Sequence, residues 1–99
     1  MAFAADLFDA GRPRDAHEEW EVRWRSLPRD SDEAWFLKGL LCASAFVVKH
    51  AEGSPGAPVL WARTLAAFAR SPRGLGLRGD EVVERLRAFV AEGTWPTLP

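Results

Sequence analysis

The stretch "WFLKGLLCASAFVV", Trp35 to Val48, decides the fold of this 99-residue chain. Apart from Lys38, Gly39 and Ser44, every residue in it is hydrophobic. A helix that is apolar on nearly every side needs neighbours on several sides. The sequence therefore predicts a central helix that Ser31 or Asp32 caps and that continues to about residue 50. With a lysine inside it, the apolar stretch is expected to be too short to cross a bilayer.

Helical periodicity recurs on both sides of this central segment, and glycine or proline marks most boundaries. Gly11 is expected to end the first helix in the left-handed conformation. Pro13 suits the first turn of the second helix, whereas Ser54 and Pro55 resemble the start of the fourth. Asp80 is predicted to cap the fifth. The four flanking helices are predicted at roughly residues 2–10, 13–26, 55–70 and 80–92.

Four main helices and a short N-terminal one, joined by short loops, predict an all-α fold. The expected arrangement is one domain over residues 1–99, a compact antiparallel bundle. Between the last two helices, "SPRGLGLRG" (Ser71 to Gly79) is predicted to be a glycine-rich loop. It lacks the lysine and hydroxyl pattern of a phosphate-binding loop, which argues against a nucleotide site. Trp95 is expected to pin the C-terminal tail to the core.

Composition limits the classes of function. The chain is 47% hydrophobic and 27% charged, with a net charge of −1, so neither nucleic acid nor a membrane is an expected partner. Its single cysteine, Cys42, permits no intrachain disulfide, and a reducing cytoplasm is the expected location. Because Cys42 lies in an apolar run, its predicted role is packing. The N-terminal "MAFAADLFDAG" lacks the basic segment of a signal peptide.

The second predicted helix contains the candidate site, in "RDAHEEWEVRWR" (Arg14 to Arg25). With His17 set at zero, Trp20, Glu21 and Trp24 project at about −60°, +40° and −20° on a helical wheel. These four side chains therefore share one face, and Glu18 flanks it. Two tryptophans favour burial of this face, and a partly buried imidazole and carboxylate need partners.

Three interpretations of this face remain open. The cluster can be structural, with His17 and Glu21 hydrogen-bonded to each other or to a neighbouring helix. It can hold a divalent metal, because an imidazole and a carboxylate four residues apart are a spacing that metals use, although a third ligand is required. It can also perform acid–base chemistry or bind a small ligand, with His17 oriented by Glu21.

Two more distant residues are candidate members of the cluster. His50 is one, but at 1.5 Å per residue it lies about 27 Å from the turn between the second and third helices, against about 14 Å for His17. A simple hairpin therefore places His17 opposite residues 42–44. Lys38 is the other, because it can pair with Glu21 or Glu18, or extend to solvent.

The second helix and its flanks resemble the signature of the DUF309 family, which reads F-x-x-G-x-x-x-x-A-H-E-x-W-E-x-x-W-R. The resemblance extends over roughly residues 3–65 and includes "GLL" (Gly39 to Leu41) and "EGSPGA" (Glu52 to Ala57). It implies an all-helical bundle without an established activity, in a family sometimes labelled a predicted metal-dependent hydrolase. The residues that carry the signature are Phe8, Gly11, Ala16, His17, Glu18, Trp20, Glu21, Trp24 and Arg25.

The chain departs from the family pattern at three positions. Lys38 and Cys42 stand where members often have glutamine, and Ser54 stands where asparagine is usual. A cation at Lys38 would repel a metal.

Two functions are therefore carried forward. The first is a structural or interaction module, as a homodimer or as the binder of a small ligand, with Trp35, Trp61 or Trp95 suited to an interface. The alternative is a metal-dependent hydrolase in which His17 and Glu21 bind the metal and Glu18 is the base.

Overall fold

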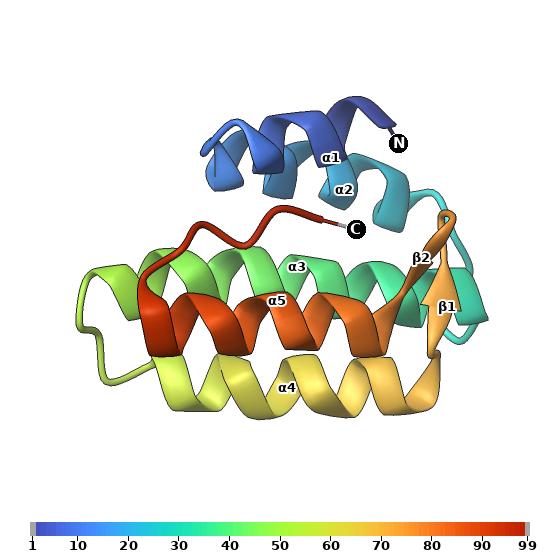
Figure 1. The fold of residues 1–99 in the computed structure, drawn as a ribbon. Helices are drawn as coiled ribbons and strands as arrows, with labels where there is room; N and C mark the ends of the chain where they lie inside the picture. Colours follow the sequence, from blue (N-terminus) through green and yellow to red (C-terminus); the bar gives the residue numbers. More distant parts are fainter. Residues whose placement is uncertain (1, 99) are drawn as a thin grey trace.

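Five helices and one short β-hairpin make up residues 2–98, which are the residues that the computed structural model describes (Figure 1). Four of the helices are long and the first is short, as predicted. The hairpin lies where a loop was predicted. The elements are α1 (Ala2–Asp9), α2 (Pro13–Arg25), α3 (Asp32–Ala51), α4 (Ala57–Arg70), β1 (Arg73–Gly74), β2 (Leu77–Arg78) and α5 (Gly79–Glu92).

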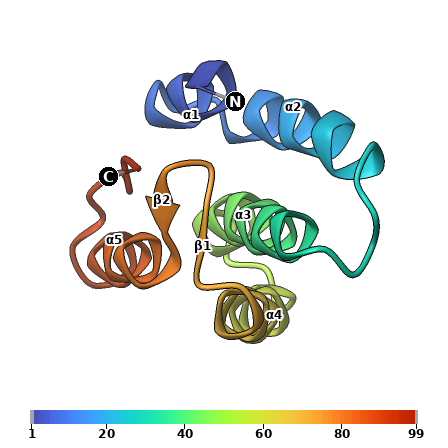
Figure 2. The same ribbon diagram turned by 90° about the vertical axis from the view of Figure 1, so that its right-hand side faces the viewer.

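Helix α3 is the centre of the fold. Viewed along its axis, it has α1 and α2 on one side, α4 on the other and α5 beside it (Figure 2). Phe36 and Leu37 are completely buried although they are adjacent in the sequence and point in different directions. The predicted central helix is therefore confirmed, and its burial on several sides explains why nearly all of its residues are apolar.

The length of α3 alone does not distinguish a core helix from a membrane span. The whole helix has 20 residues and is long and apolar enough to cross a bilayer, whereas the expectation of too short a span concerned the shorter stretch Trp35–Val48 inside it. However, 61% of the most apolar part of this helix is buried inside the fold. The other helices already cover this surface, as they do in the core helix of a globular protein.

Most helix boundaries follow the predicted caps. Ser31 begins α3, where its hydroxyl oxygen accepts a hydrogen bond from the Ala34 N–H at 3.2 Å. Gly11 and Gly93 have positive φ angles of +79° and +74°, as helix-ending glycines do. Pro13 occupies the first turn of α2.

Two helix starts differ from the prediction. Helix α4 begins at Ala57 rather than Pro55, because the Ser54 hydroxyl accepts from the Gly56 N–H at 3.2 Å and so closes a turn before the helix. Helix α5 begins at Gly79, which places Asp80 in its first turn and not at its cap.

The backbones of α3 and α5 each come very close to Phe68 of α4, and both do so at a glycine. A Cβ atom on Gly39 would lie 2.4 Å from the Phe68 ring, and one on Gly79 would lie 2.8 Å from the same side chain. Phe68 therefore occupies a notch between α3 and the start of α5 that only glycine leaves open. The Phe36 ring packs on Phe68 with its centroid 5.1 Å away, and it lies beneath Gly74 of the hairpin.

The C-terminal tail returns across the molecule to α1, as predicted for Trp95. Its indole N–H donates a hydrogen bond of 2.7 Å to the Phe8 carbonyl oxygen. The indole ring also packs against the rings of Phe8 and Phe89, at centroid distances of 5.6 and 6.2 Å. The tail thus covers the core between α1 and α5.

Candidate functional site

The face that helix α2 turns toward α3 is fully buried at its centre and partly exposed at its edge. Ala16 and Trp20 are fully buried, with 0% and 1% exposure, because they point directly at the core. His17 and Glu21 lie one turn apart at the edge of that face, and their side chains are 35% and 31% exposed. The imidazole Nδ1 is 3.6 Å from the Glu21 Oε2. The projected face is thus present, but its polar pair lies at the border of the core.

Glu21 has two partners on its own helix. One carboxylate oxygen faces His17, and the other pairs with the guanidinium of Arg25. Arg25 lies four residues after Glu21, which is a spacing that brings side chains together on a helix. The Glu21 carboxylate therefore lies between Arg25 and His17, and its contact with the His17 ring is longer than a hydrogen bond.

An open cleft borders His17, between α2 and α3, with a volume of about 400 Å³. His17 faces Ser44 and Ala45, close to the predicted residues 42–44. We call this space the His17 cleft. It is lined by Pro13, Arg14, His17, Glu18, Ser44, Ala45, Val48 and Lys49.

At the base of the His17 cleft lies a hydroxyl that is already hydrogen-bonded, and charged side chains surround the opening. The buried Ser44 hydroxyl donates to the Leu41 carbonyl oxygen at 2.9 Å, so its hydrogen is already in use. At the rim, Arg14 and Lys49 both contact Glu52, at 3.3 and 3.7 Å. All three rim side chains are substantially exposed, so these contacts contribute little to stability and can rearrange around a ligand.

Trp24 and Lys38 lie apart from the His17 cleft. Two cations lie over the Trp24 ring, with the Arg29 guanidinium 3.8 Å and the Lys38 ammonium 5.3 Å from its centroid. Lys38 is exposed and, among residues 2–98, forms no ion pair with Glu18 or Glu21. Of its two predicted positions, Lys38 therefore adopts the one that extends to solvent.

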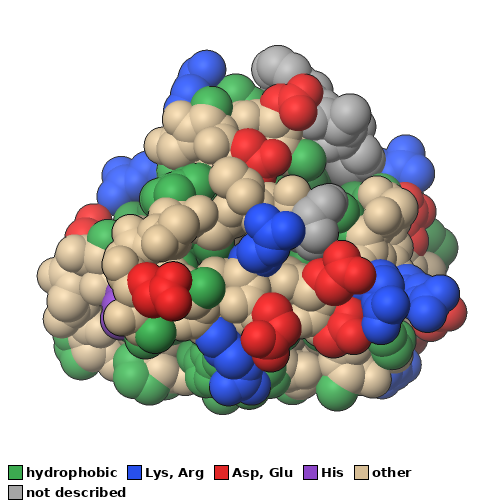
Figure 3. All heavy atoms as spheres, viewed as in Figure 1, with side chains coloured by type: hydrophobic (Ala, Val, Ile, Leu, Met, Phe, Trp, Pro, Cys, Tyr) green, Lys and Arg blue, Asp and Glu red, His purple; other side chains and the backbone are tan. Residues whose placement is uncertain are grey.

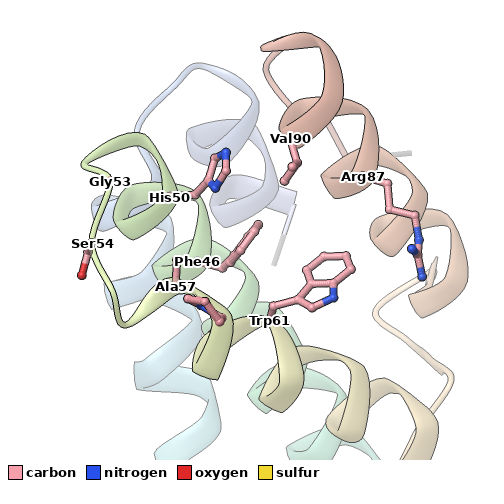
Figure 4. A pocket seen from close by; sticks show the side chains of 9 residues that line it. Phe46, His50, Gly53, Ser54, Ala57, Trp61, Arg87 and Val90 are labelled. Atoms are coloured by element: carbon pink, nitrogen blue, oxygen red, sulfur yellow. The ribbon is translucent and has the colours of Figure 1, made fainter.

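His50 belongs to a different pocket, as the distance along the helices indicated. Its ring stacks on Phe46 at 5.5 Å and meets the Phe89 ring edge-on at 5.4 Å. The pocket, with a volume of about 600 Å³, lies between α3, α4 and α5 (Figure 4). We call it the α3–α4–α5 pocket. Its lining residues are Phe46, His50, Gly53, Ser54, Ala57, Pro58, Trp61, Arg87 and Val90.

Sequence reasoning missed this pocket. The spacing of Phe46 and His50 on one helix was a usable signal, because residues four apart share a face. Arg87 and Val90 gave no such signal, since only the packing of α5 brings them beside Trp61.

The donor set around His17 is short of a metal site. No group of three or more His, Cys, Asp or Glu side chains within the described part of the chain is arranged to hold a metal ion. His17 and Glu21 offer one nitrogen and one carboxylate, whereas a catalytic zinc site uses three protein ligands. Glu18 is exposed at the cleft and completes no such set.

Cys42 is placed for packing. It is buried in α3, and this burial raises the pKa of its thiol. Lys38 and Arg63 act in the opposite direction but do not cancel the effect. A raised thiol pKa keeps the nucleophilic thiolate scarce at neutral pH.

Charges are mixed over the surface that α5 presents. On this face, acidic and basic side chains alternate without a large patch of one sign (Figure 3).

Comparison with known proteins gives one match. Residues 1–59 match DUF309, described as a domain of unknown function. This segment extends from α1 into the start of α4 and includes the whole His17 cleft. No curated protein and no solved structure matches the chain.

Proposed function

The chain belongs to the DUF309 family, and from this premise we propose that it is a binding module whose recognition site is the His17 cleft. The expected ligand is small and polar, with at least one hydrogen-bond acceptor. The family match contains every residue that lines this cleft, which supports the cleft as the site that the family signature builds.

The observation that carries the proposal is the open space beside the His17 imidazole. The Glu21 carboxylate lies 3.6 Å from Nδ1 of His17, so a ring with its proton on Nδ1 presents the Nε2 lone pair to an N–H or O–H of the ligand. Arg14 and Lys49 supply positive charge at the rim, in pairs weak enough to exchange a partner. Such a site can hold an anionic or acceptor group without any reaction taking place.

A purely structural role accounts less well for the same residues. The contact between His17 and Glu21 is 3.6 Å long and about one-third exposed, and pairs of this kind on a helix contribute about 0.3–0.5 kcal/mol. The hydrophobic core that includes Trp20 contains neither the His17 nor the Glu21 side chain.

The alternative is a metal-dependent hydrolase, with His17 and Glu21 as ligands and Glu18 as base. The closeness of the imidazole and the carboxylate favours it. A third ligand would have to come from outside the described residues, such as a second copy of the chain. Metal content therefore separates the two proposals.

The proposal is tested on ¹⁵N-labelled protein purified without an affinity tag. Inorganic phosphate, acetate and Zn²⁺ are titrated separately into the wild type, His17→Ala and Glu21→Gln. Glu19→Gln is the matched control, because Glu19 is exposed on the same helix and lines neither pocket. We expect an anion to shift the signals of Glu18, Ser44 and Lys49 in the wild type and the control, and to shift them less in His17→Ala.

Two outcomes would contradict binding at this cleft. One is the absence of any shift, together with a large fall in the melting temperature of His17→Ala, which would make the cluster structural. The other is stoichiometric metal in the purified wild type that is lost in both site variants, which would support the hydrolase.

A further inference from the structure

The α3–α4–α5 pocket is independent of the His17 cleft. The two share no lining residue, because one lies between α2 and α3 and the other between α3, α4 and α5. Its volume of about 600 Å³ is within the range of roughly 300–1,000 Å³ typical of pockets for small organic ligands.

Most of the pocket wall is apolar and already arranged around a central space. The Phe46 and Trp61 rings pack against each other at a centroid distance of 5.2 Å and an angle of 45°. Val90 points toward them from α5 (Figure 4) and is 46% exposed, although it is a large hydrophobic residue. A ligand with an apolar body would cover this exposed surface, which favours binding.

The charge of the lining selects the sign of the ligand. Arg87 and His50 line the pocket, but none of the lining residues is acidic. The Arg87 guanidinium lies 5.4 Å from the Trp61 ring centroid. Figure 4 shows the Arg87 side chain extending past Trp61 on the side away from Phe46 and His50, so the carboxylate of a ligand would meet it at the outer edge of the Trp61 ring.

Arg87 is free to accept such a partner. Its ion pair with Glu84 is 3.8 Å long, and both side chains are more than half exposed. Exposed pairs of this kind contribute about 0–1 kcal/mol, whereas guanidinium and carboxylate can form two parallel hydrogen bonds. Exchange of Glu84 for a ligand carboxylate therefore costs little.

We propose that the α3–α4–α5 pocket binds a small organic monocarboxylate with a ring-containing apolar body. The body lies against Phe46, Trp61 and Val90, and the carboxylate pairs with Arg87. His50 closes the wall at the far end, where its ring is held between Phe46 and Phe89. A cationic ligand finds no acidic partner in this lining.

The test compares three probes that share an apolar phenylalkyl body and differ in their head group: 4-phenylbutyrate, 4-phenylbutanamide and 4-phenylbutylamine. Each is titrated into the ¹⁵N-labelled protein, and the Trp61 indole signal, assigned with Trp61→Phe, is followed. We expect the acid to bind at least about tenfold more tightly than the amide, since charge-assisted hydrogen bonds to arginine are lost in the amide. The amine is expected to bind most weakly.

Variants separate the two parts of the pocket. Arg87→Gln is expected to weaken acid binding about tenfold and to leave amide binding unchanged. Arg63→Gln is the control, because Arg63 is an exposed cation of α4 outside the lining. Val90→Trp places a large side chain in the pocket from an exposed position and is expected to abolish binding of the acid and of the amide.

The results that would overturn the proposal are distinct from those that test the His17 cleft. Equal affinity for acid and amide, or an Arg87→Gln variant that binds the acid normally, would remove the charge argument. Absence of binding by all three probes would remove the pocket. A dimer in sedimentation that Val90→Trp dissociates would assign the pocket to a second copy of the chain. His17→Ala should leave phenylbutyrate binding unchanged.

Discussion

The indole N–H of Trp95 donates a hydrogen bond to the backbone carbonyl oxygen of Phe8, 87 residues earlier in the chain. The tail that carries Trp95 forms three more hydrogen bonds with the helices. The Leu98 N–H donates to an Asp9 carboxylate oxygen at 2.7 Å, and Arg85 donates to the hydroxyl and carbonyl oxygens of Thr97 at 3.1 and 3.3 Å. These bonds make the tail a cover for the core between α1 and α5.

Replacement of Trp95 should separate the hydrogen bond from the ring packing. Trp95→Phe keeps an aromatic ring against Phe8 and Phe89 but loses the N–H donor, and we expect it to lower the free energy of unfolding by about 1 kcal/mol. Trp95→Ala loses both and should cost about 3 kcal/mol. Urea unfolding measures both values, with Thr94→Ala at an exposed position as control. Equal losses in the two Trp95 variants would contradict this division.

Gly39→Ala should destabilise the protein although alanine is the better helix former. The new methyl group would lie 2.4 Å from the buried Phe68 ring, which Gly79 and Phe36 hold in place. Overpacking of this kind costs about 1–3 kcal/mol, more than the gain of about 1 kcal/mol in helix propensity. Thermal unfolding should show a melting temperature lower by several degrees.

A second substitution tests the cause of that loss. Phe68→Leu removes Cε1 and Cζ, two of the three ring atoms closest to the new methyl group, so the double variant Gly39→Ala/Phe68→Leu should lose less stability than the sum of the single variants. Gly56→Ala is the matched control, because its Cβ would meet only the Ser54 hydroxyl oxygen, at 3.6 Å. Additive losses would show that the Phe68 notch is not the cause.

Cys42 should make the protein less stable in alkali. Burial raises the pKa of its thiol in the folded state, so above the ordinary thiol value of about 8.5 the unfolded chain ionises first. The free energy of unfolding then falls as the pH rises toward and through the folded pKa. Urea unfolding at pH 7.5 and 10 should show a smaller fall in Cys42→Ala than in the wild type. The chain has no tyrosine, which removes another common source of alkaline dependence.

Asp80 should titrate below the usual range of an aspartate. Hydrogen bonds from Arg78, at 3.2 and 2.8 Å, and from the Glu81 N–H lower the pKa of its carboxyl. Its contribution to stability is therefore present above the ordinary aspartate pKa and is lost as the pH falls through the lowered value. Carbon-detected NMR titration of Asp80 measures the shift. Arg78→Gln should raise the Asp80 pKa most of the way back to the ordinary aspartate value. An unchanged titration midpoint in that variant would contradict the assigned cause.

Features encoded over a few residues were predictable. The cap at Ser31, the turn at Gly11 and the shared face of His17 and Glu21 each depend on neighbours within four positions. The apolar run of α3 also carried its own signal, because no helix with so little polar surface can lie at the edge of a bundle.

Features that depend on distant contacts were not predictable. The hairpin strands have two residues each, too short for an alternating pattern, and the turn between them places Leu75 and Gly76 at φ +53° and +73°. Positive φ at both positions marks a type I′ turn, for which leucine is an unusual first residue. The Arg14–Glu52 contact at the rim of the His17 cleft spans 38 positions and left no local pattern either.

The α3–α4–α5 pocket is lined partly by residues inside the family match and partly by residues beyond it. Phe46 and His50 lie within the segment that defines the family, whereas Trp61, Arg87 and Val90 lie beyond it. Substitutions in α4 and α5 can therefore alter which compound this pocket accepts without changing the signature helix. For this chain, membership of the family predicts a shared arrangement of α1 to α3, but it does not predict a shared ligand.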